Sequence, residues 1–393
     1  MTLARRIALA FLYACGALSL VMLLPLPWMP IPLAAIALLA AGLTIYCTRG
    51  SERVPSRLSP IDALTLLVIV GYCFYATISR PWEWDYWAIW GLKGRVFYDA
   101  GGIDWHYLET PWNQFSHPDY PLLLPLHYAF VSLLQGGWDD RWFGVSFILF
   151  GIALVIVIRE RAARDLSPSL ASLVTLAIAA RSVSRYVGMA EGPLVAYGTA
   201  GLLFARCGGM TNAAILLGFA ASTKNEGLTL FAAVVVALLV ERRARDVLRL
   251  WPAVAIAAPW LLMRAVHGLG TDLAAGSPFE RLVRHLGETS IIVGDLAESF
   301  PDGWLWLGIL AGIITMWILG RTTQTERFLV VAVAAQFVFF LGAYFVTPHD
   351  VQWHISSSWP RLVRQLEPPA LFAALLGLAR YIAPHAEARP EQQ

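Results

Sequence analysis

The sequence predicts an all-α membrane protein that crosses the bilayer about twelve times. Hydrophobic residues make up 58% of the 393 positions and charged residues only 14%, and so few charges do not cover a water-facing surface. The apolar residues form runs of helical length without two-residue alternation, and a helix satisfies all its backbone groups within one such segment. The 16 Trp residues also favour a membrane interface.

Hydrophobic runs of spanning or near-spanning length define the expected helices. They lie at roughly 7–24, 31–48, 61–79, 141–158, 168–182, 190–206, 210–222, 226–240, 250–266, 302–319, 327–346 and 368–383. The first run resembles a signal sequence, but no clear cleavage site follows it, so we expect a retained helix. We treat 1–393 as one membrane domain, with an extra N-terminal hairpin (1–60), a central module (61–240) and C-terminal helices (241–393).

Arginines in the short loops predict the orientation of the helices. They lie before the first run and after the second, fourth, eighth and tenth runs: Arg5, Arg6, Arg49, Arg53, Arg57, Arg159, Arg161, Arg164, Arg242, Arg243, Arg245, Arg249, Arg321 and Arg327. Cytoplasmic loops are rich in Arg, so all clusters agree if the N-terminus is inside and segment 121–136 lies flat. Its two prolines favour this arrangement, although the sequence leaves open whether the segment spans.

The predicted external loop 80–120 holds two polar motifs. In WDYWAIWGLK, Asp85 and Lys93 lie about 80° apart around a helix, and a carboxylate at the membrane boundary is a candidate base. In SHPDYP, His117 is a candidate phosphate contact, while Asp119 is a candidate to orient it or to bind a metal. An aromatic belt and a rigid solvated turn are the purely structural alternatives.

Two further motifs interrupt apolar runs. Glu191, in GMAEGPL, begins a membrane helix, where an acidic group is a functional candidate or a carboxylate favoured by the helix dipole. Lys224 and Glu226, in STKNEGL, break an otherwise continuous apolar stretch. Such a break marks either a polar cavity or a simple turn.

The other predicted external loops are 267–301 and 347–361. The second holds His349 and Arg361, and an Arg guanidinium is well suited to phosphate. A metal site built on His349 and His354 without a third ligand has weak support. The Cys residues show no CxxC spacing, so we expect no disulfide framework. With a net charge of +2 and no long basic run, we expect no nucleic-acid partner.

The order of these motifs resembles the GT-C superfamily of integral membrane glycosyltransferases, such as protein O-mannosyltransferases and lipid A aminoarabinose transferases. The similarity covers roughly 60–240. WDYWAIW resembles the first acidic motif, HPDYPLLLPL the Pro-rich element before flat helices in the first external loop, RSVSRYVGMAEGPL the second acidic motif, and STKNEGL the Thr-Lys-Gly element. The chain departs from the family in having two extra helices before this loop and a lone Asp in the first motif.

The resemblance implies inverting transfer of a sugar from a polyprenyl-phosphate donor to a glycan, lipid or protein acceptor. The reaction would occur at the external face of a bacterial-type inner membrane. Asp85 would act as the base, and Glu191, the acidic residue of the second motif, is the other catalytic candidate. The substrate-binding candidates are Lys93, His117, Asp119, Lys224, Glu226, His349 and Arg361. A Mg²⁺ or Mn²⁺ ion bound by Glu191 and Asp119 is compatible with the resemblance, as is catalysis without a metal.

Two other functional classes compete with this interpretation. A transporter or flippase of lipid-linked saccharides suits the charges at Lys224 and Glu226, but we find neither a clear internal repeat nor mid-helix polar groups to favour it. An O-antigen ligase or polymerase is the second alternative. The absence of Walker A, GxGxxG, HExxH and GxSxG motifs removes the usual signatures of ATP-driven transport, Rossmann-type nucleotide binding and hydrolysis.

Overall fold

The structure is a computed structural model that describes residues 2–48, 57–182, 187–207 and 209–382, and it confirms an all-helical chain. Every regular element in these ranges is helical. The α-helices are α1 (Leu3–Met22), α2 (Pro30–Cys47), α3 (Ile61–Ile78), α4 (Gly91–Ala100), α5 (Trp105–Glu109), α6 (Leu123–Gln135), α7 (Phe143–Ala162), α8 (Pro168–Ser182), α9 (Glu191–Cys207), α10 (Met210–Thr223), α11 (Glu226–Val240), α12 (Ala244–Leu248), α13 (Trp251–Val266), α14 (Pro278–Gly287), α15 (Thr289–Glu298), α16 (Gly303–Ile318), α17 (Gln324–Phe345), α18 (Val351–Gln365) and α19 (Glu367–Ile382).

Within the described ranges, six helical segments are long and apolar enough to cross a membrane. They are Leu3–Met22, Pro30–Cys47, Ile61–Ile78, Asp140–Ala162, Ala244–Val266 and Gln324–Phe345. The bent pairs α15–α16 and α18–α19 raise the number to eight if each is one span. The chain therefore has the helices of a membrane protein, but the predicted number of twelve is not confirmed.

The difference between the twelve predicted spans and the six to eight candidate spans comes mainly from shorter helices in the middle of the chain. α8, α10 and α11 have 15, 14 and 15 residues, or about 21–23 Å at ~1.5 Å per residue. The hydrocarbon layer is about 30 Å thick. Tyr197 of α9 and Leu217 of α10 are fully buried in the main core. Helices that other helices surround are not required to match the bilayer, and hydropathy does not distinguish them from spanning helices.

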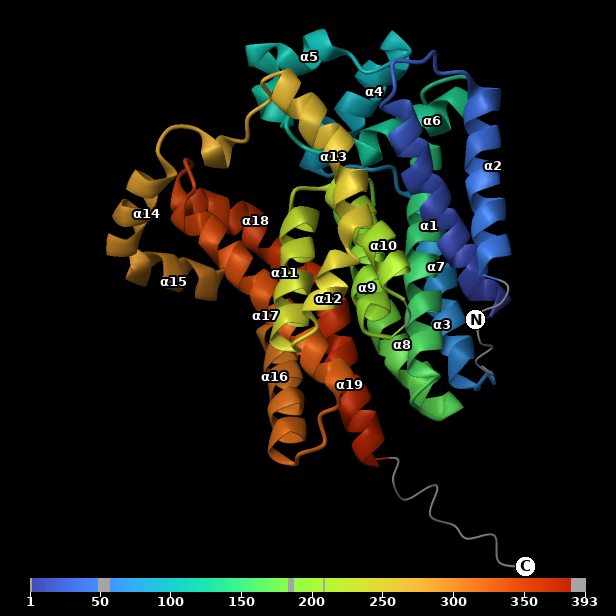
Figure 1. The fold of residues 1–393 in the computed structure, drawn as a ribbon, viewed down its shortest axis with the longest axis vertical. Helices are drawn as coiled ribbons and strands as arrows, with labels where there is room; N and C mark the ends of the chain where they lie inside the picture. Colours follow the sequence, from blue (N-terminus) through green and yellow to red (C-terminus); the bar gives the residue numbers. More distant parts are fainter. Residues whose placement is uncertain (1, 49–56, 183–186, 208, 383–393) are drawn as a thin grey trace, which may run out of the picture.

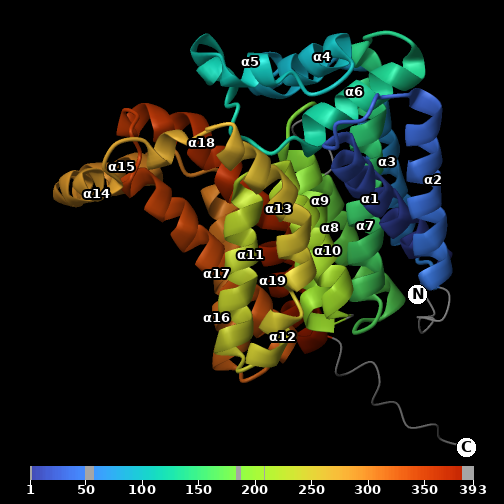
Figure 2. The same ribbon diagram turned by 45° about the horizontal axis from the view of Figure 1, so that its top comes forward.

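The axes of most of the long helices are roughly aligned, and these helices form a bundle (Figure 1). α4 and α5 lie across one end of it (Figure 2), which we call the loop-side end. α6 packs against α4, and a Cβ added at Gly94 would lie 3.1 Å from the Pro125 carbonyl oxygen. α6 has 13 residues, about 20 Å at ~1.5 Å per residue, and is too short to cross the hydrocarbon layer unaided.

The arginine-rich loops gather at the opposite end of the bundle, where the N-terminus lies (Figure 1). Arg5 at the start of α1 forms an ion pair of 3.2 Å with Glu160 near the end of α7. Arg161 Nη2 donates to Thr325 Oγ1 of α17 at 3.2 Å, and Arg243 Nη2 donates to the Ala205 carbonyl of α9 at 3.1 Å. The described arginine clusters therefore share one end. Arg49 and Arg53 lie outside the described residues.

Buried aromatic rings attach the first loop to the bundle. Residues Tyr86–Trp90 form a π-helical turn that runs directly into α4. Tyr86 lies 5.8 Å from Tyr128 of α6, and Tyr128 stacks on Phe143 of α7 at 4.4 Å between ring centroids. A π-turn contains one more residue per hydrogen-bonded ring than an α-helix. It therefore shifts the register between Asp85 and Lys93.

Candidate functional site

Five charged side chains form a continuous cluster at the loop-side end. Arg361 of α18 contacts Asp85 through Nη1 and Oδ2. The same Nη1 lies 3.5 Å from Glu191 Oε1. Lys224 Nζ lies 3.0 Å from Glu191 Oε1 and 2.8 Å from Glu226 Oε1. We call Asp85, Glu191, Lys224, Glu226 and Arg361 the charge cluster.

Helix ends place most of these groups. Glu191 begins α9, Lys224 follows the last residue of α10, and Glu226 begins α11. The turn that carries Lys224 is tight, because a Cβ at Gly227 would collide with the Ala220 carbonyl group. Only a residue without a Cβ fits there unless the backbone shifts. Helix ends thus bring charges that are far apart in sequence to one level of the bundle.

The two side chains at the centre of this cluster are buried, so the charged state of each depends strongly on the other. The side chains of Glu191 and Lys224 are 1% and 6% exposed. Burial opposes the charged form of Lys224, but Glu191 and Glu226 outweigh it and raise the pKa of this ammonium above its usual value. Glu191 Oε2 is buried without a hydrogen-bond partner. Within the described residues, no other side chain pairs with this second carboxylate oxygen.

A second group of charges, the histidine–aspartate cluster, consists of His117, Asp119 and Asp272. One donor atom from each lies within 4.8 Å of the others. His117 Nδ1 is 3.7 Å from Asp272 Oδ2, and His349 Nε2 lies 3.1 Å from the same oxygen. Burial lowers the pKa of His117, and burial together with Asp272 raises the pKa of Asp119.

The two clusters adjoin each other. Asn225, between Lys224 and Glu226 in the chain, donates from Nδ2 to Asp119 Oδ2 at 3.2 Å. Tyr120 lies close to both clusters: burial raises the pKa of its phenol, and Glu226, Asp119, Asp272 and Asp85 raise it further. The catalytic and substrate-binding candidates from the sequence therefore all lie in one region, and one of them differs from the expectation in its orientation.

Lys93 is that residue. It was predicted to contact substrate phosphate, but its side chain is fully buried. Its Nζ donates to the His117 carbonyl oxygen at 2.7 Å and lies over the rings of Trp90 and Tyr120. Burial lowers the pKa of this ammonium to about 7. Lys93 thus supports the loop at His117 instead of facing Arg361.

The two predicted metal ligands, Glu191 and Asp119, have different surroundings. Glu191 Oε1 is next to the cationic groups of Lys224 and Arg361, and these repel a metal ion. Glu191 also stands outside the group of donor atoms that approach one another closely. Asp119 belongs to that group. The described residues thus fit a metal at the histidine–aspartate cluster, and the predicted site shared by Glu191 and Asp119 does not fit.

Sequence reasoning missed several residues of this region. Asp272 lies in the predicted external loop 267–301, but no motif marks it. Arg264 Nη1 donates to the Asp119 carbonyl oxygen at 3.4 Å, and Asn225, within STKNEGL, was not predicted to be a site residue. A charged or amide residue at the end of an apolar run is the signal that identifies Asn225 and Arg264. Asp272 has no comparable signal.

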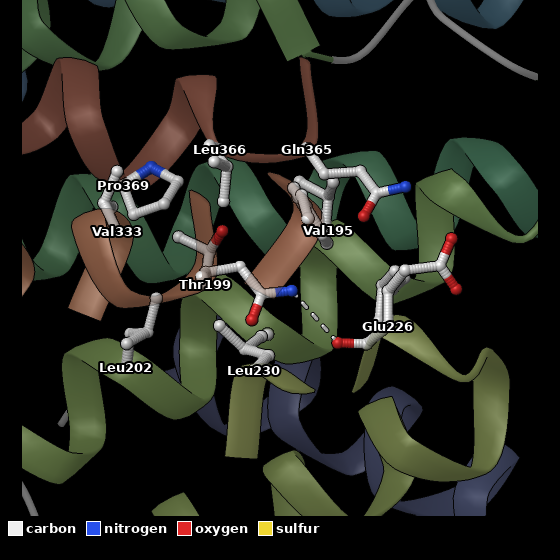
Figure 3. Close-up of a pocket in the computed structure, with 13 residues that line it drawn as sticks. Val195, Thr199, Leu202, Glu226, Leu230, Val333, Gln365, Leu366 and Pro369 are labelled. Atoms are coloured by element: carbon white, nitrogen blue, oxygen red, sulfur yellow. Dashed lines mark hydrogen bonds between the residues drawn. The ribbon is translucent and has the colours of Figure 1, made fainter. Parts of the chain in front are cut away.

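A narrow pocket extends from Glu226 into the bundle, between α9, α11, α17 and the junction of α18 with α19 (Figure 3). Its walls are mostly apolar, and its accessible volume is about 20 Å³, room for about one water. Gln336, in the middle of α17, lines it and donates to the Glu226 carbonyl oxygen at 3.2 Å and to Thr229 Oγ1 at 2.8 Å. Gln336 is buried, so the expectation of no mid-helix polar group was wrong.

The fold and site define an all-helical protein with six to eight candidate membrane spans and a charge cluster at one end of its bundle. Comparison with protein-family models, with curated proteins and with solved structures finds no match. The functional interpretation therefore depends on the geometry of the site.

Proposed function

We propose that this protein is an integral membrane glycosyltransferase that moves a sugar from a polyprenyl-phosphate donor to a hydroxyl acceptor. The observation that supports it is the position of Arg361, whose guanidinium meets the carboxylates of Asp85 and Glu191 from two other segments. A phosphate that binds this guanidinium would lie next to the Asp85 carboxylate, which is then available as a base. This agrees with the GT-C resemblance of the sequence.

In the proposed reaction, the donor phosphate binds Arg361 and Lys224. A guanidinium and an ammonium are suitable partners for phosphate oxygens. Phosphate competes with Asp85 for Arg361, so its binding releases the Asp85 carboxylate. The acceptor oxygen then attacks the anomeric carbon while its proton passes to Asp85. The bond from the anomeric carbon to the phosphate oxygen breaks, and its electron pair leaves with the phosphate, which the two cations stabilise.

The same proposal places the loop-side end at the external face of a bacterial-type inner membrane. It is supported by the arginine-rich loops at the other end, because Arg is enriched in cytoplasmic loops. The acceptor would be a glycan or lipid, or a protein.

The experiment is a transfer assay with membranes that contain the protein and a panel of radiolabelled polyprenyl-phosphate sugars. We expect one donor to be consumed, with release of polyprenyl phosphate and label in an acceptor. Glu191→Gln should weaken this turnover, because Glu191 holds Lys224 and Arg361 in place. Glu298→Gln, a change of an exposed carboxylate on α15, should leave it unchanged. Absence of turnover with every donor, or full activity of Glu191→Gln, would contradict the proposal.

A transporter or flippase of lipid-linked saccharides remains the second candidate. Buried Gln336 in mid-helix and the break at Lys224–Glu226 favour it, because polar groups within the bundle are typical of transport pathways. Proteoliposomes with a fluorescent polyprenyl-phosphate sugar distinguish the two functions. Movement of intact lipid across the bilayer supports transport, and cleavage of the sugar–phosphate bond supports transfer. An O-antigen ligase or polymerase would instead require a diphosphate-linked oligosaccharide.

A further inference from the structure

The histidine–aspartate cluster has the donor set of a divalent metal site. It offers one imidazole nitrogen and two carboxylates, with donor atoms within 4.8 Å of one another. Ligand atoms that share one ion at about 2.1 Å lie about 3–4 Å apart. The His117–Asp272 pair, at 3.7 Å, already falls in that range. A small movement of Asp119 or of the loop would complete the arrangement.

The nearby cations Lys93 and Arg264 attract Asp119 electrostatically, but within the described residues neither donates a hydrogen bond to its carboxylate. Lys93 donates to the carbonyl oxygen of His117, and Arg264 donates to the carbonyl oxygen of Asp119. Asp119 is 1% exposed, and the hydrogen bond described at its carboxylate comes from the neutral amide of Asn225. Two carboxylates brought together in this way repel each other unless a proton or a cation lies between them.

The imidazole of His117 provides a second, independent observation that favours a metal site. His117 Nδ1 is buried without a hydrogen-bond partner, although it faces Asp272. A buried ring nitrogen normally has a partner, and a metal ion is the partner that a neutral imidazole and a carboxylate share. His349 also contacts Asp272, with Nε2 3.1 Å from Oδ2. A hydrogen bond of this kind orients a carboxylate that binds a metal.

We propose that His117, Asp119 and Asp272 bind a divalent transition-metal ion such as Mn²⁺ or Zn²⁺. An imidazole ligand favours these ions over Ca²⁺ and Mg²⁺, which prefer oxygen ligands alone. The ion would join the loop before α6 to the loop after α13, and through His349 to the loop before α18. It would thus hold these three loops together. This site does not depend on the proposed transferase activity.

The test is Mn²⁺ binding to the purified full-length protein in nanodiscs after treatment with EDTA, followed by electron paramagnetic resonance without any donor. We expect about one tightly bound ion per chain, with nitrogen modulation from an imidazole ligand and displacement by Zn²⁺. His117→Ala should remove the nitrogen modulation, and His117→Ala and Asp272→Asn should each weaken binding by more than about 10-fold.

Matched controls come from the same end of the molecule. His106 of α5 and Asp99 of α4 are exposed, so His106→Ala and Asp99→Asn should bind Mn²⁺ like the wild type. Asp272→Glu retains a carboxylate and should still bind, with an altered spectrum, which separates ligand loss from misfolding. Failure of the wild type to bind Mn²⁺ or Zn²⁺, or unchanged binding in His117→Ala, would overturn the site. Neither result bears on sugar transfer.

Discussion

Lys224 Nζ lies 3.0 Å from Glu191 Oε1, and both side chains are almost completely enclosed by protein. They come from different helix ends, with Lys224 after α10 and Glu191 at the start of α9. A buried ion pair offsets the cost of removing both charges from water only while both partners are present. The pair therefore couples the packing of α9 and α10 to the chemistry of the site.

Removal of this lysine should destabilise the protein. Lys224→Met leaves Glu191 buried with only the more distant Arg361 as a cation, so we expect a loss of about 3–5 kcal/mol in the free energy of unfolding. Denaturant unfolding in detergent micelles measures it. The double variant Glu191→Gln/Lys224→Met should lose clearly less than the two single variants combined. Additive losses would show that the two groups do not interact.

Replacement of Asp85 by asparagine should affect activity more than stability. The amide oxygen still accepts a hydrogen bond from Arg361, so the melting temperature should stay close to that of the wild type. Transfer should fall by about 100-fold or more, because asparagine does not accept the acceptor's proton. The donor-consumption assay measures the rate. A variant that retains full activity would exclude Asp85 as the base.

The turn between α10 and α11 should not tolerate a side chain at Gly227. Gly227→Ala introduces a Cβ that collides with the Ala220 carbonyl, and we expect a loss of about 1–3 kcal/mol together with displacement of Lys224. Gly308 of α16 has nothing within 4 Å of an added Cβ. Gly308→Ala should therefore be neutral or slightly stabilising. Thermal unfolding of the two variants in parallel tests the difference, and equal behaviour would argue against the tight turn.

Labelling of single cysteines should reveal the orientation of the bundle. In a background without the natural cysteines, Trp112→Cys lies at the loop-side end and Arg245→Cys at the arginine-rich end, and both wild-type residues are exposed. In intact cells, a membrane-impermeant maleimide should label the first variant alone. Labelling of Arg245→Cys instead would reverse the proposed orientation.

Local pattern was sufficient to predict the helices and the positions of their charged ends. A side chain that carries a charge is costly within a lipid-facing helix, so charges concentrate where hydrophobic runs stop, as at Glu191 and Lys224. This cost is a property of a short stretch of sequence. For that reason, the all-helical architecture and most residues of the charge cluster were accessible without coordinates.

Tertiary packing determined which of these charged side chains contact one another. The structure was also needed to find which helices are long enough to span a membrane. Arg361 reaches Asp85 across 276 positions of the chain, and Asp272 joins His117 without any motif to mark it. The π-turn at Tyr86–Trp90 precedes the helix that carries Lys93 into the loop at His117. The two cations beside Glu191 make this carboxylate a poor metal ligand. Periodicity reports only the face a residue takes on its own helix, whereas these pairings depend on how distant segments pack.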